Sequence, residues 1–165
     1  MSRPKIPIPT DETDRLLDRL GWLALLVMIA LPAYYFNALP EVIPRHFNLQ
    51  GEPDGYGSKW MIWLLPAVGA AMFFGLRALY PYPHLYNYPV EISPENAERQ
   101  YRGGVKLVRS LNTLVVMVFA YLTYGTIQAG LGNQWGLGNS FTLVFLGLLA
   151  ILLGYYWYQA RRDDS

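Results

Sequence analysis

The chain has 165 residues, of which 53% are apolar and only 15% are charged, and it contains no cysteine. A typical soluble domain carries about 25% charged residues, so this composition favours a membrane protein with a single domain. The absence of cysteine excludes disulfides and thiolate metal sites. The net charge of +1 gives no support for nucleic-acid binding.

Four long stretches contain no charged residue: 20–39, 60–76, 110–130 and 131–160. A helix of about 20 residues crosses the roughly 30 Å hydrocarbon core of a bilayer. We therefore predict an all-α membrane protein, a four-transmembrane-helix bundle that forms one domain over 20–158, with spans at about 20–39, 60–79, 111–130 and 141–158. A soluble protein is the alternative, but a globule of this size cannot surround four long uncharged helices.

The connections between the spans differ in charge. Of the thirteen Lys and Arg residues, Arg45 and Lys59 lie in the first loop, and the other eleven lie in or beside the tails and the middle connection. Because positive loops stay inside, this asymmetry predicts that both termini are cytoplasmic. The expected segments are cytoplasmic tails at 1–19 and 159–165, an extracytoplasmic loop at 40–59 and a cytoplasmic connection at 80–110.

Two local patterns predict how the helices begin and pack. Ser93, Pro94 and Glu95 have the order of a helix N-cap, a first helical residue and a first-turn acid. A juxtamembrane helix should begin there and continue into the third span. In the second span, small residues recur one turn apart at Ala67, Ala71 and Gly75, which favours close helix packing.

The juxtamembrane helix has a basic face. Its members share one side because they are spaced by three, four and three residues: Arg99, Arg102, Lys106 and Arg109. Glu95 and Glu98 precede the first two by one turn, which leaves Lys106 and Arg109 nearest the lipid headgroups. Attraction of anionic lipid at the cytoplasmic face is the favoured explanation, and docking of a cytoplasmic partner is the alternative.

The first loop is dense in proline and glycine. Pro40 and Pro44 stiffen the chain as it leaves the first span, and Glu52-Pro53-Asp54-Gly55 is a strong turn signal. We therefore expect a structured extracytoplasmic cap rather than a flexible tether.

The loop follows the pattern L-P-x-x-x-P-x-H-F-N-x-x-G-x-P-D-G-Y-G-S-K directly after a membrane helix, and this resembles the bacterial membrane family called domain of unknown function 1648. The motif residues are Pro40, Pro44, His46, Phe47, Asn48, Gly51, Pro53, Asp54, Gly55, Gly57, Ser58 and Lys59. The stretch 87–101 is similar to the segment that follows in single-domain members of the family. The cytoplasmic motif and basic face comprise Asn87, Tyr88, Pro89, Asn96, Arg99, Gln100, Tyr101, Arg102, Lys106 and Arg109.

This family forms the N-terminal domain of the Sdp-type toxin-immunity membrane proteins. The resemblance, which covers roughly residues 20–125, implies a multi-pass protein of the bacterial cytoplasmic (inner) membrane. In the immunity branch it would imply protection against a secreted membrane-active toxin and signalling to a cytoplasmic repressor. Those proteins carry further spans in a second conserved region, whereas four spans are predicted here.

Catalytic chemistry finds little support. Glu41, His46, Glu52 and Asp54 offer ligand types for a metal, but they lack the spacing of a zinc motif, so a histidine hydrogen-bonded within the cap is favoured. No hydrolase or phosphate-binding motif is present, and the spans lack the ionisable residues that mark transport pathways. We expect no catalytic residue, metal or cofactor.

These observations predict a non-enzymatic integral membrane accessory protein that recognises a protein or peptide partner at the cell envelope, including an immunity-like or signalling role. The alternative is a structural subunit of a larger membrane complex, which would dock through aromatic belts and small-residue faces. A small-solute transporter or membrane enzyme comes third. The expected partners are the lipid bilayer, a membrane or envelope protein, and anionic lipid at the cytoplasmic face.

Overall fold

The computed structural model describes residues 3–48, 50–133 and 139–162. Four α-helices and one β-hairpin make up most of the described chain. In order they are α1 (Glu12–Tyr35), β1 (Val42–Phe47), β2 (Pro53–Ser58), α2 (Leu64–Leu79), α3 (Ala97–Gly130) and α4 (Asn139–Arg162). Two short 3-10 helices, η1 (Lys59–Trp63) and η2 (Pro83–Leu85), precede α2 and follow it.

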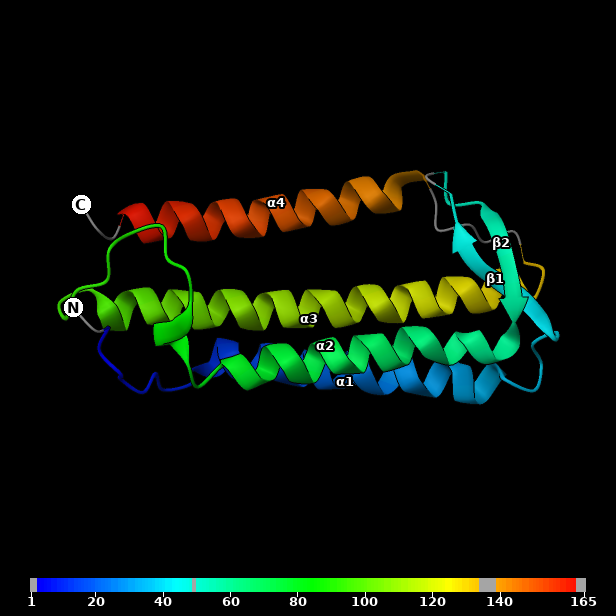
Figure 1. Ribbon diagram of the computed structural model, residues 1–165, viewed down its shortest axis with the longest axis horizontal. Coiled ribbons are helices and arrows are strands. Elements are labelled where there is room, and N and C mark those ends of the chain that lie inside the picture. Colours follow the sequence, from blue (N-terminus) through cyan, green and yellow to red (C-terminus); the bar gives the residue numbers. More distant parts are fainter. Residues whose placement is uncertain (1–2, 49, 134–138, 163–165) are drawn as a thin grey trace.

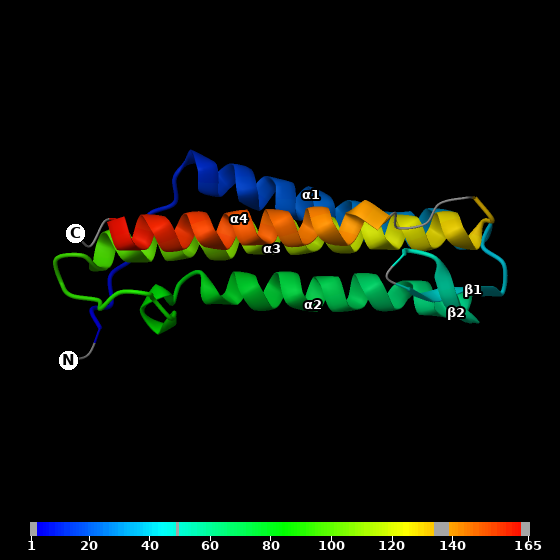
Figure 2. The same cartoon turned by 90° about the horizontal axis from the view of Figure 1, so that it is seen from above.

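The helix α3 is the centre of the molecule. The helices α1 and α2 pack against it on one side, and α4 contacts it on the other (Figures 1 and 2). The hairpin β1–β2 lies at one end of the bundle, which we call the hairpin end (Figure 1). The start of α3, the end of α4 and the connection between α2 and α3 lie at the opposite end, which we call the connection end.

Each of four helical segments is long and apolar enough to cross a membrane: Glu12–Tyr35, Lys59–Leu79, Ala97–Gly130 and Phe141–Arg162. The prediction of a helical, multi-pass membrane protein is thus confirmed. The loop between the first two spans is more regular than the sequence indicates, because it contains an antiparallel pair of strands. The juxtamembrane helix and the third span form one continuous helix of 34 residues, α3.

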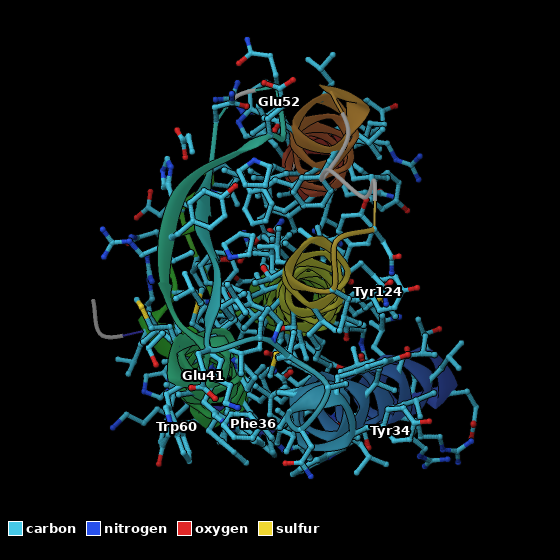
Figure 3. All side chains as sticks on the ribbon, turned by 90° about the vertical axis from the view of Figure 1, so that its right-hand side faces the viewer. Tyr34, Phe36, Glu41, Glu52, Trp60 and Tyr124 are labelled. Carbon is cyan, nitrogen blue, oxygen red and sulfur yellow. The ribbon has the colours of Figure 1, made fainter. Side chains whose placement is uncertain are left out.

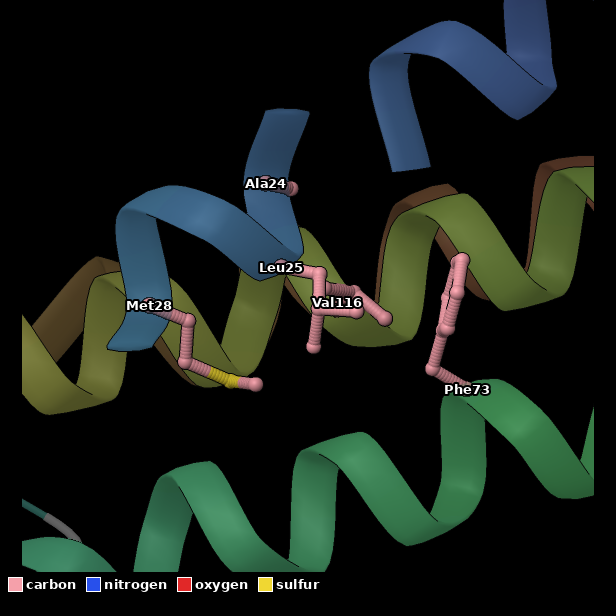
Figure 4. Packing of buried hydrophobic residues seen from close by; sticks show 5 residues of the cluster. All are labelled: Ala24, Leu25, Met28, Phe73 and Val116. Carbon is pink, nitrogen blue, oxygen red and sulfur yellow. The ribbon is translucent and has the colours of Figure 1, made fainter. Parts of the chain in front are cut away.

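The core between α1, α2 and α3 is small and apolar. It contains Ala24, Leu25, Met28, Phe73 and Val116 (Figure 4). The close approach of α2 depends on Gly69, where an added Cβ would lie 2.7 Å from Met28 Sδ. The stripe of Ala67, Ala71 and Gly75 is exposed instead, so the packed face of α2 is a different one from the face that small-residue spacing indicates.

Side-chain hydrogen bonds accompany the start of two of the helices, α1 and α3. Asp11 caps α1, since its Oδ1 accepts from Asp14 N at 2.9 Å while Asp14 Oδ2 accepts from Asp11 N at 3.0 Å. The start of α3 was expected just after Ser93, but the helix begins at Ala97. The reason is that Asn96 Oδ1 accepts from Ser93 N and Asn96 Nδ2 donates to Glu91 O, both at 2.9 Å, which holds a turn before the helix.

Candidate functional site

The tip of the hairpin is built by one asparagine and one glycine. Asn48 Oδ1 accepts from Gln50 N at 3.0 Å and from Glu52 N at 2.9 Å, so its side chain takes the place of a backbone turn. Gly51 has a φ of 80°, a left-handed conformation that disfavours other residues. These two motif residues therefore have a structural role in closing the hairpin.

Two further glycines allow side chains to cross the hairpin. A Cβ on Gly55 would lie 3.2 Å from His46 Cβ, and a Cβ on Gly57 would lie 2.7 Å from Met61 Sδ and 3.2 Å from Arg45 Cδ. The bare backbone of β2 thus makes room for Arg45 and His46 of β1. The ladder is irregular on either side of His46, where bulges re-aim the strand.

The base of the hairpin is seated on the bundle by a second apolar cluster. It consists of Leu39, Ile43, Ile62 and Ile127, all less than 5% exposed. Gly130 at the end of α3 makes this contact close, because a Cβ there would lie 3.1 Å from both Ile43 Cγ2 and Leu39 Cδ2. The hairpin is therefore held in one orientation rather than hanging from its two connections.

Other motif residues brace the same base. Lys59 Nζ lies 2.9 Å from Glu41 Oε1 and 5.2 Å from the centre of the Phe36 ring, and Lys59 N donates to Glu41 O. Ser58 caps η1, since its Oγ accepts from Trp60 N. The prolines and Phe47 complete the frame: Pro44 is buried opposite Tyr56, Phe47 pairs with Pro53, and Pro40 is exposed.

The exposed residues of the two strands include Arg45, His46, Asp54 and Tyr56. His46 Nδ1 lies 2.5 Å from Asp54 Oδ1, which joins the two strands across the face. Tyr56 is 59% exposed. We call these four residues the hairpin face. Figure 3 looks onto the hairpin end and shows that the hairpin runs from Glu41, beside α2, to Glu52, beside α4.

The hairpin face presents one cation, one aromatic ring and a paired imidazole and carboxylate. Tyrosine and arginine are enriched at protein interfaces. Within the described residues, no three His, Cys, Asp or Glu side chains are close enough together to hold a metal ion.

A charged cluster occupies the connection end, between α1, α2 and α3. Arg109, which is 6% exposed, donates to Asp18 and has its Nε 3.8 Å from Asp14 Oδ1. Arg77 of α2 lies 3.3 Å from the other oxygen of Asp18. Lys106 Nζ lies 2.6 Å from Asp11 Oδ2. Lys106 and Arg109 were expected beside lipid headgroups. Arg109 is buried among the acids of α1, whereas Lys106 is half-exposed.

Neutral groups complete the cluster. The ring of Tyr80 lies 4.4 Å below the Arg109 guanidinium, and Tyr80 OH accepts from Asn112 Nδ2 at 2.8 Å. Burial raises the pKa of Tyr80. Sequence reasoning missed Asp14, Asp18 and Asn112. The available signal was that Asp11, Asp14 and Asp18 share one face of α1 and match the spacing of Lys106 and Arg109 on the parallel helix α3.

The remaining predicted residues of the connection end fasten separate segments to α3. Gln100 Nε2 donates to Ala160 O of α4 at 2.9 Å, and Tyr101 OH donates to Pro4 O at 3.1 Å. Arg102 pairs with Glu98 at 3.1 Å, as the sequence indicates. Arg99 lies along a groove between the helices, Asn87 is exposed, and Pro89 is half-buried.

Two tyrosines of the connection pack on Gly104 of α3. A Cβ on Gly104 would lie 2.8 Å from Tyr88 OH and 3.2 Å from the Tyr86 ring. Burial raises the pKa of Tyr88 and raises that of Tyr86 to about 12, so both stay neutral and packed at physiological pH. Arg3 Nη1 donates to Tyr86 O at 2.5 Å, which fixes the N-terminal tail against the same segment.

The family of the hairpin segment follows from comparison with known proteins. Residues 23–70 match the family described as "Domain of unknown function (DUF1648)". The predicted family is confirmed over this segment. The DUF1648 segment thus comprises the first span from Leu23, the whole hairpin and the start of α2.

An uncharacterized protein of Archaeoglobus fulgidus is 39% identical to the chain over 62 residues. The alignment covers 38% of this chain and 34% of the archaeal protein, so the chain spans about a third of the length of the relative it matches. No solved structure matches the chain. DUF1648 proteins thus include an archaeal one, and the resemblance is concentrated on part of the chain.

Proposed function

We propose that this protein is a non-enzymatic membrane accessory protein that recognises a protein or peptide at the extracytoplasmic side of a prokaryotic cell membrane. The hairpin face is the proposed contact surface. The observation that carries the proposal is that the hairpin is seated by Leu39, Ile43 and Ile127 while Arg45, His46, Asp54 and Tyr56 stay exposed. A surface ordered before binding loses less conformational entropy on binding.

The orientation belongs to the same proposal. The basic residues concentrate at the connection end, and the hairpin lies at the opposite end of the bundle. The positive-inside bias then puts the hairpin outside the cell and both termini in the cytoplasm. An immunity-like role, in which the hairpin face binds a secreted membrane-active peptide, is one form of this function.

Site-specific photocrosslinking in intact cells tests the proposal. A photoreactive phenylalanine analogue in place of Tyr56 should give a discrete crosslinked product, and the same analogue in place of Tyr34 should not. Tyr34 is a matched control because it is 81% exposed at the same end of the bundle but lies outside the hairpin.

The crosslinked partner is then purified and its affinity measured for the intact chain and for variants. His46→Ala and Asp54→Ala should each weaken binding, whereas Tyr34→Ala, at an exposed residue outside the hairpin, should leave it unchanged. Equal crosslinking from the two sites, or binding that is insensitive to both face variants, would contradict the proposal.

A structural subunit of a larger membrane complex is the second candidate, and the packing of α4 favours it. The apolar windows of α1, η1–α2 and α3 are 22–28% buried, whereas none of the residues in the window of α4 is buried. Purification from native membranes in mild detergent distinguishes the candidates. A stable stoichiometric complex supports the subunit, and a chain that purifies alone argues against it.

A further inference from the structure

A groove of about 500 Å³ opens at the connection end between α1, α3 and α4. The helix α3 forms its floor, Thr13 and Leu17 of α1 form one wall, and Leu152 and Tyr156 of α4 form the other. None of the described residues that line it belongs to the connection between α2 and α3. The volume is within the range of about 300–1,000 Å³ that is typical of ligand pockets.

The lining changes from charged to apolar along the length of α3. Arg99, Arg102 and Lys106 line the part toward the cytoplasmic end, and none of the described lining residues is acidic. Leu107, together with Leu17 and Leu152, lines the part nearer the middle of the bundle. A cationic mouth that leads to an apolar base matches a molecule with an anionic head and a hydrocarbon tail.

The cations at the mouth are available to such a head. Arg102 contacts Glu98, and Lys106 contacts Asp11, whose carboxylate side chains are 69% and 37% exposed. Ion pairs this exposed contribute little to stability, about 0–1 kcal/mol. A phosphate that enters the groove can therefore bind Arg102 and Lys106 alongside their carboxylate partners. No buried ion pair has to be broken.

The place of the groove in a membrane protein identifies the occupant. It lies beside Tyr155 and Tyr156, aromatic residues near the end of a span, where side chains sit at the level of lipid headgroups. Basic pockets between transmembrane helices on the cytoplasmic side are recognised sites for anionic lipid heads. Water solvates the leucine-lined base poorly, so a hydrocarbon chain is the better filling.

We propose that this groove binds one anionic phospholipid, with its phosphate between Arg102 and Lys106 and an acyl chain over Leu107 and Leu152. The lipid then fills the space between α1 and α4, two helices that each contact α3. This inference is independent of the partner that the hairpin recognises. The proposed site is one defined position on the protein, in contrast to a general attraction of the basic residues for the membrane surface.

Lipid retention by the purified full-length chain tests the proposal. The protein in mild detergent is titrated with phosphatidylglycerol or phosphatidylcholine, and bound lipids are counted by native mass spectrometry. We expect one phosphatidylglycerol to be retained in preference to phosphatidylcholine. The double variant Arg102→Gln/Lys106→Gln should weaken this binding about 25-fold, since each basic residue near an anionic head contributes about fivefold.

Two further variants separate the groove from general charge. Gly103→Leu should abolish retention, because Gly103 lines the groove and the new side chain would occupy it without changing the charge. Arg161→Gln removes one charge from an exposed residue at the end of α4, outside the groove, and should leave affinity within about twofold. Gly103→Ala shows whether the position tolerates a side chain, since its Cβ would make an ordinary 3.6 Å contact with Tyr156.

Three results would overturn the proposal. The first is equal retention of the two lipids, and the second is unchanged retention in the double variant. The third is displacement of the lipid by glycerol 3-phosphate, which would make a soluble phosphate compound the ligand. If Gly103→Leu does not fold, the double variant decides alone, because both of its substitutions are at half-exposed positions.

Discussion

Gly51 shows how a single residue determines the shape of the hairpin tip. Its φ of 80° lies in the left-handed region, and the Asn48 carbonyl accepts from its N–H at 2.9 Å. A side chain at this position costs about 1–2 kcal/mol because Cβ crowds the neighbouring carbonyl. The motif glycine is therefore required by backbone geometry and need not touch any partner.

Gly51→Ala should destabilise the hairpin tip by about 1–2 kcal/mol, with faster amide hydrogen exchange in β1 and β2. Gly75→Ala is the matched control, since Gly75 is helical and exposed with no atom within 4 Å of an added Cβ. The control should be neutral or slightly stabilising. Equal exchange rates in the two variants would show that the tip does not depend on Gly51.

Asp11 gives a pH-dependent contact between helices. The hydrogen bond from the Lys106 side chain, with that from Asp14 N, lowers the pKa of Asp11 from its ordinary value of 3.8. A lowered folded-state pKa means that the ionised form is favoured in the folded protein. The stabilisation is therefore present above pH 3.8 and is lost as the pH falls through the lower folded-state pKa.

Asp11→Asn tests this linkage, because asparagine keeps the helix cap and removes the charge. The intact chain should be more stable than the variant at neutral pH, and the difference should shrink as the pH falls below 3.8. Thermal unfolding at a series of pH values measures it. A difference that stays constant down to pH 2 would mean that Lys106 contributes nothing through this pair.

At the scale of the elements, the buried ions of α1 and α3 hold two parallel helices in register. Arg109 and Asp14 are 6% and 2% exposed, and Arg109 also donates to Asp18. Removing one member of a buried ion pair leaves its partner uncompensated, which costs about 3–5 kcal/mol. The cost is large because Asp14, which is 2% exposed, cannot return to water without separating the helices.

Arg109→Met should therefore lower the unfolding free energy by about 3–5 kcal/mol. Arg15→Met is the control, since Arg15 and its partner Glu12 are 54% and 82% exposed and the pair contributes at most about 1 kcal/mol. Unfolding by a denaturing detergent compares the two variants. Similar losses would show that burial does not determine the importance of these arginines.

The hairpin depends on a different kind of contact. Ile43 is 1% exposed, whereas Val42 beside it is 60% exposed. Ile43→Ala should cost about 2–5 kcal/mol and release the hairpin from α3, while Val42→Ala should cost far less. Hydrogen exchange that rises in β1 and β2 but not in α1 would confirm a local release. Exchange that rises throughout would mean that the cluster supports the whole bundle.

At the scale of the whole molecule, the chain places its hairpin and its connection at opposite ends of four membrane-length helices. The absence of cysteine makes single-cysteine labelling direct. With an impermeant maleimide on intact cells, Gln50→Cys should be labelled and Asn87→Cys should be labelled only after lysis. Both residues are exposed. Labelling of both, or of Asn87→Cys alone, would contradict the proposed orientation.

The sequence was sufficient for four membrane-length helices, the family of residues 23–70 and an ordered first loop, because each leaves a local signal. Charge-free runs have the length of a bilayer. Asn48 defines the hairpin tip through its side-chain oxygen, and Gly51 does so through its left-handed backbone. The pairing of Arg109 with Asp14 and Asp18 could not be predicted in the same way. Rules for spacing within one helix cannot give the register between two helices. The same limit applies to Gly69, which is identified as a packing residue only once α1 and α3 surround it.

Gln100 and Tyr101 are consecutive residues that hold two segments far apart in the sequence. Tyr101 binds the Pro4 carbonyl, and Gln100 binds the Ala160 carbonyl. During synthesis the segment that contains Pro4 leaves the ribosome long before Tyr101 does. The segment that contains Ala160 leaves long after Gln100. Asp14 and Asp18 of α1 likewise cannot pair with Arg109 until that residue has been translated. The segment at Pro4 must therefore stay unfastened until α3 has been synthesised, and the contact of Gln100 can form only after Ala160 has been translated.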